Sequence, residues 1–294
     1  MCGIVGLFLK DRTLEPELGG LLSDMLVTMT DRGPDSAGIA VYGAAEEGRA
    51  RLTVQSAAPA KDRATLEALA EAHDAALSVK DTHAVLTLAA ADLPALRRAV
   101  EAAPTLRVMS AGEAMEVYKE TGLPADVVTR FGLRAMSGSH GIGHTRMATE
   151  SAVTTLGAHP FSTGADQCLV HNGSLSNHNN LRRVLIREGI RFETENDSEV
   201  AAAYLTARLA EGRNLGEALD GALADLDGFY TFVVGTKSGF GVLRDPVACK
   251  PAVMAETDRY VAFGSEYRAL VGLPGIDLAR VWEPEPATVY FWER

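Results

Sequence analysis

The apolar residues of the chain follow two patterns, that of buried strands and that of helices with one apolar face. These patterns predict strands near both ends and helices between them. Gly3–Leu9 is a short apolar run with β-branched residues, which is typical of a buried strand. Between residues 16 and 29, apolar side chains recur every three or four positions, the spacing of one helix face. Gly33-Pro34 ends that pattern. A second strand is expected over residues 37–42.

Residues 57–138 have a different, alanine-rich texture. Their pattern predicts, in order, a helix over 64–78, a strand over 83–88, a helix over 93–102 and a strand over 106–109. This order indicates a small α/β subdomain inserted into the main fold, and it holds no cluster of catalytic residue types. We therefore expect one domain over residues 1–294 with this insertion inside it.

Polar residues of the types that catalyse reactions or bind ligands become more frequent after the insertion. Residues 141–151 are polar and include few side chains that a core would need. A strand-like stretch at 167–170 then runs into His171-Asn172-Gly173, and a helix is expected over 180–188. Polar side chains gathered in this way indicate a site rather than a core.

Two helix starts and a run of short strands complete the pattern. Asn196 with Glu199, and Asn214 with Glu217, have the spacing of a capping box, in which two side chains satisfy each other's backbone N–H groups. The last third predicts strands separated by turns, over residues 229–235, 240–243, 252–255, 260–263 and 288–292. Strands at both ends with helices between them favour an α+β fold in which helices cover antiparallel sheets.

Composition narrows the class of protein. The chain has 294 residues, 47% of them hydrophobic, and a formal charge of −11, which argues against a nucleic-acid partner and an anionic membrane surface. No apolar run reaches the roughly 18 residues of a membrane span, and no leader pattern is present. Three scattered cysteines suit neither a disulfide framework nor a zinc site. We expect a cytoplasmic protein without a metal.

Cys2 is the most informative single position. If Met1 is removed, the thiol and a free α-amine share one residue. An α-amine has an ordinary pKa of about 7.7–8.0, so near neutral pH it can take a proton from a thiol and create a nucleophile. Position 2 alone favours the simpler interpretation of a small buried residue at the head of a strand.

Six short stretches resemble the glutaminase domain of class II glutamine amidotransferases, which are N-terminal-nucleophile (Ntn) hydrolases. In chain order they are Met1-Cys2-Gly3-Ile4-Val5-Gly6, Arg32-Gly33-Pro34-Asp35-Ser36-Ala37-Gly38, Gly143-His144-Thr145-Arg146, Ala158-His159-Pro160, His171-Asn172-Gly173 and Asn196-Asp197-Ser198-Glu199-Val200. Each stretch is short, but all six occur in the family's order. The resemblance implies a four-layer αββα sandwich of two antiparallel sheets flanked by helices.

The resemblance also implies catalytic roles. Cys2 would be the nucleophile and its own α-amine the base. The side-chain amide of Asn172 and the backbone N–H of Gly173 would form the oxyanion hole, where losing one donor typically costs about 2.7–4 kcal/mol. Glycine suits this second position because no Cβ stands between its N–H and the substrate.

Substrate binding is carried over in the same way. Arg146 matches the family's arginine for the α-carboxylate of glutamine, a task suited to a planar bidentate donor. Asp197 matches the acid that binds the α-ammonium. Thr149 and His159 fall in the surrounding pocket segments, and Arg32 in the loop that shapes the surroundings of the nucleophile.

Each of these residues also has a purely structural interpretation. A helix dipole stabilises Asp197 in a first turn whatever it binds. Asn172-Gly173 is an ordinary turn dipeptide, and Arg146 suits a surface ion pair. The structural alternatives do not explain why all of these residues accompany Cys2.

The matched stretches leave no room for a synthase domain in 294 residues, so the acceptor site is expected on another polypeptide. This arrangement resembles the separate amidotransferase-like subunit of N-methylglutamate synthase and of glutamate-synthase-like complexes. The resemblance implies a hetero-oligomer whose flavin mononucleotide and iron–sulfur clusters belong to partner subunits, with no cofactor in this chain. The substrate would be glutamine or glutamate. Some positions depart from the family's motifs, such as Met147, where an aromatic residue is common. These departures bear on which acceptor receives the nitrogen.

Two other hypotheses remain open. One is a non-catalytic regulatory or docking subunit that keeps the glutamine or glutamate pocket. The other is a stand-alone amidohydrolase for a different γ-glutamyl compound.

Overall fold

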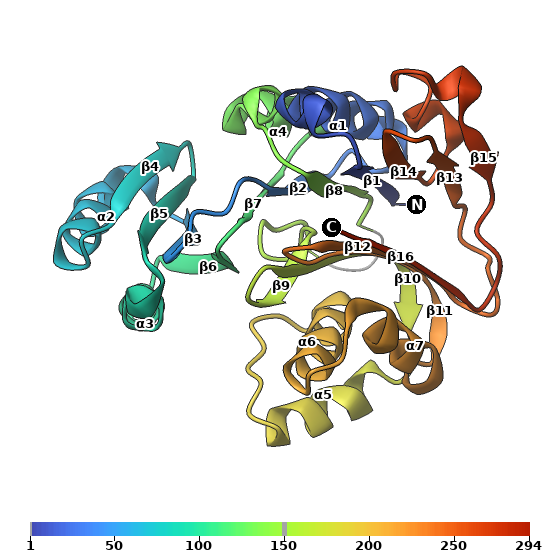
Figure 1. Ribbon diagram of the computed structural model, residues 1–294. Helices are drawn as coiled ribbons and strands as arrows, with labels where there is room; N and C mark the ends of the chain where they lie inside the picture. Colours follow the sequence, from blue (N-terminus) through green and yellow to red (C-terminus); the bar gives the residue numbers. More distant parts are fainter. Residues whose placement is uncertain (1, 149–151) are drawn as a thin grey trace.

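Two antiparallel sheets lie face to face, with helices on the outer side of each (Figure 1). The computed structural model describes residues 2–148 and 152–294. The seven-stranded sheet has the order β15 (Arg280–Trp282), β13 (Val253–Glu256), β14 (Tyr260–Gly264), β1 (Gly3–Leu9), β8 (His140–Arg146), β2 (Ser36–Tyr42) and β7 (Met115–Thr121). The five-stranded sheet has the order β16 (Thr288–Glu293), β12 (Gly239–Arg244), β11 (Gly228–Gly235), β10 (Gln167–Leu175) and β9 (Phe161–Gly164).

The outer layers complete the predicted αββα sandwich. Helices α1 (Leu18–Thr28) and α4 (Pro124–Phe131) cover the larger sheet, while α5 (His178–Arg187), α6 (Asp197–Ala210) and α7 (Leu215–Asp225) cover the smaller one (Figure 1). Short 3-10 helices stand at η1 (Arg12–Glu17), η2 (Thr30–Arg32), η3 (Ala90–Asp92), η4 (Leu133–Ala135), η5 (Tyr267–Ala269) and η6 (Ile276–Leu278). Within the described ranges, no helix is long and apolar enough to cross a bilayer.

Strand β1 shows why the first apolar run has no polar alternation. Ile4 and Phe8 point into the core between the two sheets, and Val5, Leu7 and Leu9 point into the core under α1. Because both faces are buried, a continuous apolar sequence is required. The predicted strand and the predicted fold class are confirmed.

Strand β8 corrects the interpretation of residues 141–151 as a polar segment outside the core. His140–Arg146 is buried throughout and hydrogen-bonds to β1 on one side and β2 on the other. Its polar side chains find partners inside the fold: His140 contacts the carbonyl of Thr236, and His144 that of His171. Burial of polar residues is tolerated when each is hydrogen-bonded, and hydrophobic periodicity cannot detect such a strand.

Residues 49–112 form a separate four-stranded antiparallel sheet, called the small module below. It contains β3 (Arg49–Ser56), α2 (Pro59–Ala72), β4 (Ala76–Lys80), β5 (His83–Ala89), α3 (Leu93–Glu101) and β6 (Leu106–Gly112). The sheet order β4-β5-β3-β6 is that of a split β-α-β-β-α-β unit. The helix expected over 64–78 is wrong in its second half, because Asp74 has φ +47° and turns the chain into β4. The domain division at residues 57 and 138 stays a prediction, although β7 and α4 pack with the main sheet.

The carboxylate of Asp166 joins the small module to the main body. It accepts backbone N–H groups from Glu113 (2.7 Å), Ala114 (2.9 Å) and Met115 (2.9 Å), directly after β6. The backbone N–H of Asp166 in turn donates to Ala111 O (2.9 Å). Asp166 stands immediately before β10, so one buried side chain links the module to the strand that carries Asn172.

We expect Asp166→Ala to lower the free energy of unfolding by about 1–3 kcal/mol, because it leaves buried N–H donors without an acceptor. Urea unfolding followed by circular dichroism measures the change. Asp258→Ala, at an exposed carboxylate, is the matched control and should change stability by less than about 0.5 kcal/mol. Equal stability of the two variants would contradict this account of the junction.

Candidate active site

Cys2 lies at the head of the central strand β1, where three segments meet. Its carbonyl accepts hydrogen bonds from Arg32 Nε (3.0 Å) and Asn172 Nδ2 (3.3 Å). The next peptide is fixed by Ser265, whose hydroxyl accepts the N–H of Ile4 (2.9 Å). Cys2 is half-buried and free of disulfides. These contacts hold its backbone at the edge of the two-sheet core.

Arg32 is held in place by an ion pair that links distant parts of the chain. Its Nη1 lies 2.6 Å from Glu266 Oε1, and only 9% of its side chain is exposed. The hydrogen bond from Arg32 lowers the pKa of the Glu266 carboxyl, with a further contribution from Arg268. Gly33 follows because the backbone of β8 passes so close that a Cβ would lie 2.4 Å from Arg146 N.

Asn172 and Gly173 lie next to Cys2 from the opposite sheet. Asn172 is buried on β10, and its amide is aimed at the carbonyl of Cys2. Gly173 has φ +146°, and a Cβ there would lie 2.0 Å from the carbonyl oxygen of Phe229. Glycine is therefore required by both the backbone conformation and the close approach of β11.

Arg146 and Asp197 occupy the ends of two elements near this point. The register that pairs Gly3 with Thr145 sets Arg146, the last residue of β8, across from Cys2. Arg146 is buried, and its Nη1 donates to the carbonyl of Ala152 (3.3 Å). Asp197 opens α6, and its Oδ2 accepts the backbone N–H of Leu175 (2.9 Å). A carboxylate in this first turn is also favoured by the helix dipole.

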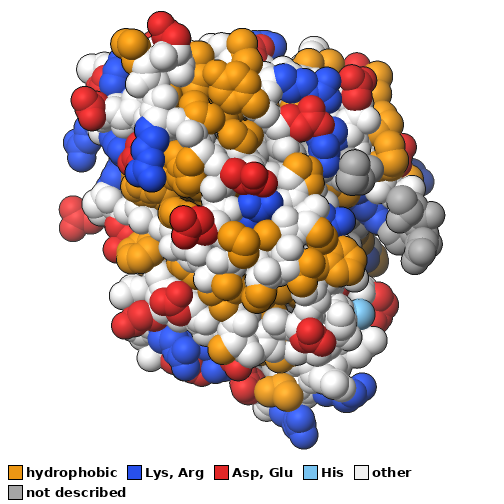
Figure 2. Space-filling view, turned by 90° about the vertical axis from the view of Figure 1, so that its right-hand side faces the viewer, with side chains coloured by type: hydrophobic (Ala, Val, Ile, Leu, Met, Phe, Trp, Pro, Cys, Tyr) orange, Lys and Arg blue, Asp and Glu red, His pale blue; other side chains and the backbone are white. Residues whose placement is uncertain are grey.

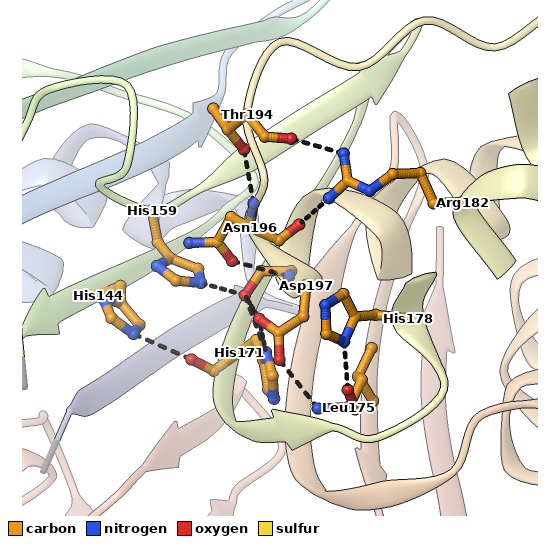
Figure 3. Close-up of polar contacts among 10 residues, drawn as sticks. His144, His159, His171, Leu175, His178, Arg182, Thr194, Asn196 and Asp197 are labelled. Carbon is orange, nitrogen blue, oxygen red and sulfur yellow. Dashed lines mark hydrogen bonds and ion pairs between the residues drawn. The ribbon is translucent and has the colours of Figure 1, made fainter. Parts of the chain in front are cut away.

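Three buried histidines, His144, His159 and His171, lie together behind these residues (Figure 3). His159 Nε2 and His171 Nδ1 each lie 2.8 Å from Ser198 Oγ. His144 Nε2 lies 3.0 Å from the carbonyl of His171, and its ring stacks on that of His159 with centroids 4.0 Å apart. A serine hydroxyl has one proton, so when it donates to one imidazole, the other must donate to Ser198.

Burial keeps these imidazoles neutral at pH 7. It lowers the pKa of His144 to about 3 and lowers the pKa of His159 well below its usual range. Burial also lowers the pKa of His171, although Asp197, 3.8 Å away, opposes the shift. Neutral rings with fixed hydrogen bonds position Asp197 and the neighbouring Asn172 without adding charge beside them.

The structure brings the predicted residues into two linked groups. Cys2, Arg32 and Asn172 share the carbonyl of Cys2. His159 and Asp197 meet through Ser198 and His171, the residue before Asn172. Thr149 lies outside the described residues. In the part of the chain that the structure describes, no set of His, Cys, Asp and Glu side chains is arranged to hold a metal ion.

Sequence reasoning gave no role to several members of these groups. His144, His171 and Ser198 lie inside the stretches that carried the resemblance, so their signal was present but unassigned. Glu266 had no local signal, because its partner Arg32 is 234 positions away in the chain.

The fold is that of the Ntn-hydrolase amidotransferases. Glutamine phosphoribosylpyrophosphate amidotransferase from B. subtilis, solved with ADP and GMP, matches 99% of this chain and 47% of its own with a TM-score of 0.64 at 19% identity. A family model described as a glutamine amidotransferase domain matches residues 144–272.

Relatives in sequence extend the match over the whole chain. The glutamine amidotransferase-like protein GlxB of Rhizobium meliloti (strain 1021) is 74% identical over 296 residues, covering 100% of this chain and 98% of GlxB. An amidophosphoribosyltransferase of Synechocystis sp. (strain ATCC 27184 / PCC 6803 / Kazusa) is 33% identical over 51% of this chain and 32% of its own length. The chain belongs to the glutamine amidotransferase family.

We expect stability to fall as the pH is lowered from about 6.5 towards 5. The folded pKa values of the buried histidines lie below the unfolded value of about 6.5, so in this range the unfolded chain binds more protons than the folded one. Each such histidine removes up to about 1.4 kcal/mol per pH unit. Urea unfolding across this range measures the effect, and a constant or rising transition midpoint would contradict it.

Proposed function

We propose that this chain is a glutaminase subunit in which Cys2 hydrolyses the side-chain amide of glutamine. Once Met1 is removed, the α-amine takes the thiol proton and the sulfur attacks the amide carbon. The C–N bond breaks as the proton passes to the leaving nitrogen, giving ammonia and a thioester. Water then cleaves the thioester to glutamate and restores the thiol. The observation that carries this proposal is the hydrogen bond of Asn172 to the carbonyl of Cys2.

Asn172 and Gly173 are the proposed oxyanion donors. The amide of Asn172 has two N–H groups, and one of them donates to the carbonyl of Cys2. The second N–H of the same amide would donate a hydrogen bond to the oxyanion that develops beside the thiol. Each such donor contributes about 2.7–4 kcal/mol to stabilising the transition state.

Arg146 and Asp197 are the proposed anchors for the two ends of glutamine. Arg146 would bind the α-carboxylate and Asp197 the α-ammonium, in keeping with the charges of these groups. Arg32 orders the backbone of the nucleophile, and His159 holds the start of α6 through Ser198. The family resemblance adds Thr149 to the residues proposed to bind glutamine.

Cys2→Ala should abolish release of glutamate from glutamine while leaving the fold intact, since it removes the only proposed nucleophile. A coupled glutamate assay and circular dichroism measure the two properties. Cys249→Ala, at an exposed cysteine, is the matched control and should keep wild-type activity. Unchanged release in Cys2→Ala would refute the nucleophile. Intact-mass measurement tests the precondition, because retained Met1 blocks the amine and favours the non-catalytic alternative.

We also propose that the ammonia is used by a separate synthase subunit, in a complex of the N-methylglutamate synthase or glutamate-synthase type. Any flavin mononucleotide or iron–sulfur cluster of that complex would belong to the partners. Exposed apolar side chains support a docking surface at Tyr267, Val271, Leu278 and Val281. Figure 2 faces the side on which β13, β14 and β15 lie, and hydrophobic side chains are widespread over it. Ser265 and Glu266, which contact the start of β1 and Arg32, precede this stretch directly.

Co-purification tests this partner. Mass spectrometry should identify a synthase subunit, and adding that subunit should increase glutamate release. Leu278→Asp should weaken binding of the partner by at least about tenfold, because Leu278 is 86% exposed and a buried charge at an interface is costly. The matched control is Leu123→Asp, at a residue 45% exposed at the start of α4. Full activity without any partner would instead favour a stand-alone hydrolase.

A further inference from the structure

A cleft of about 750 Å³ separates the small module from the main body, and it is distinct from the site around Cys2. One wall is formed by α3 and β6 of the module. The other is formed by β9 and the loop before α6. The proposed glutaminase reaction uses none of these walls.

The charged side chains of the cleft are only partly matched. Arg97 pairs with Glu101 at 2.8 Å, and Lys119 donates to the carbonyls of the segment around His159. Among the described residues, no opposite charge lies within ion-pair distance of Arg107, Arg191 or Glu193. Arg107 Nη1 donates to the carbonyls of Pro104 (2.9 Å) and Leu106 (2.7 Å). The cleft therefore presents two cations and one carboxylate that form no ion pair among the described residues.

Two further observations mark a polar ligand rather than a dry groove. Ser110 lines the cleft, is 2% exposed, and has a hydroxyl without a hydrogen-bond partner among the described residues. Partial desolvation and the neighbouring Glu199 raise the pKa of Glu193, while Arg107, Lys119 and Arg97 oppose the shift. A further cation beside this exposed carboxylate would stabilise its charged form. Buried polar groups left without partners are rare in folded proteins.

We propose that this cleft binds a dicarboxylic amino acid. Its two carboxylates complement Arg107 and Arg191, and its ammonium complements Glu193. A simple anion would leave Glu193 unpaired, and an apolar ligand would leave all three charges unpaired.

The inner end of the cleft makes the ligand an effector of the neighbouring site. Lys119 Nζ donates to the carbonyl of Ala158 (2.8 Å), the residue before His159. The carboxylate of Glu199 accepts the backbone N–H groups of Glu193 (2.8 Å) and Thr194 (2.8 Å), and α6 begins at Asp197. A ligand that orders this loop therefore acts on the helix start that carries Asp197.

Isothermal titration with L-glutamate tests the proposal, using the full chain in an Asp197→Asn background so that the glutamine pocket does not contribute. Glutamate should bind, and Arg107→Gln with Arg191→Gln should weaken it by at least about tenfold. Arg98→Gln with Arg183→Gln, at two exposed arginines outside the cleft, is the matched control and should leave affinity unchanged. Thermal unfolding verifies that each variant folds.

Glutarate and inorganic phosphate identify the chemical class. Glutarate lacks the ammonium and should bind less tightly than glutamate, and Glu193→Gln should remove this difference. Hydrogen exchange should slow on both walls, in residues 107–110 and 191–194, when glutamate is present. No binding of glutamate, equal binding of phosphate, or wild-type affinity in the double arginine variant would each overturn the proposal.

Discussion

Both faces of the central strands of the two main sheets are buried, and this constraint determines how polar groups are arranged between the layers. A polar side chain on an inner strand has no water nearby, so it must find its partner within the layers. His144 and His171 meet this requirement with one ring nitrogen each, at the carbonyl of His171 and at Ser198 Oγ. Their other ring nitrogens have no partner among the described residues. The candidate site lies where this internal network reaches the half-buried Cys2. The close packing around the carbonyl of Cys2 is a direct result of this arrangement.

Local sequence pattern predicted the apolar strands well and the polar interior poorly. Gly3–Leu9 was recognisable because two buried faces require a continuous apolar run. β8 was missed because its polar residues are satisfied by partners far away in the chain. Equal spacing also led to different outcomes: Asn214 and Glu217 form the predicted capping box, whereas Glu199 instead accepts N–H groups from the loop before α6. The choice between two nearby sets of donors depends on tertiary structure.

The residues predicted from family resemblance illustrate the same division. Asn172 and Gly173 could be named from the sequence because a motif preserves residue type and backbone geometry, and their roles as oxyanion donors stay a prediction. Glu266, the partner of Arg32, was not predictable, since nothing in the spacing of two residues 234 positions apart indicates contact. The small module shows an intermediate case: its helices were expected, but the topology of its sheet follows only from long-range pairing. The hydrogen bonds of Asp166 attach the small module to the main body directly before β10.

The backbone of Gly173 has a consequence for how this site can diverge. Any side chain at that position would collide with the carbonyl of Phe229, so drift through single substitutions is blocked there. The role proposed for Asn172 depends on its side chain, which is a constraint separate from the backbone of the strand. Of the two adjacent proposed donors, one is therefore fixed by the fold and the other by selection alone. Related proteins that have lost the proposed glutaminase activity should therefore keep the glycine at position 173 and carry a different residue at position 172.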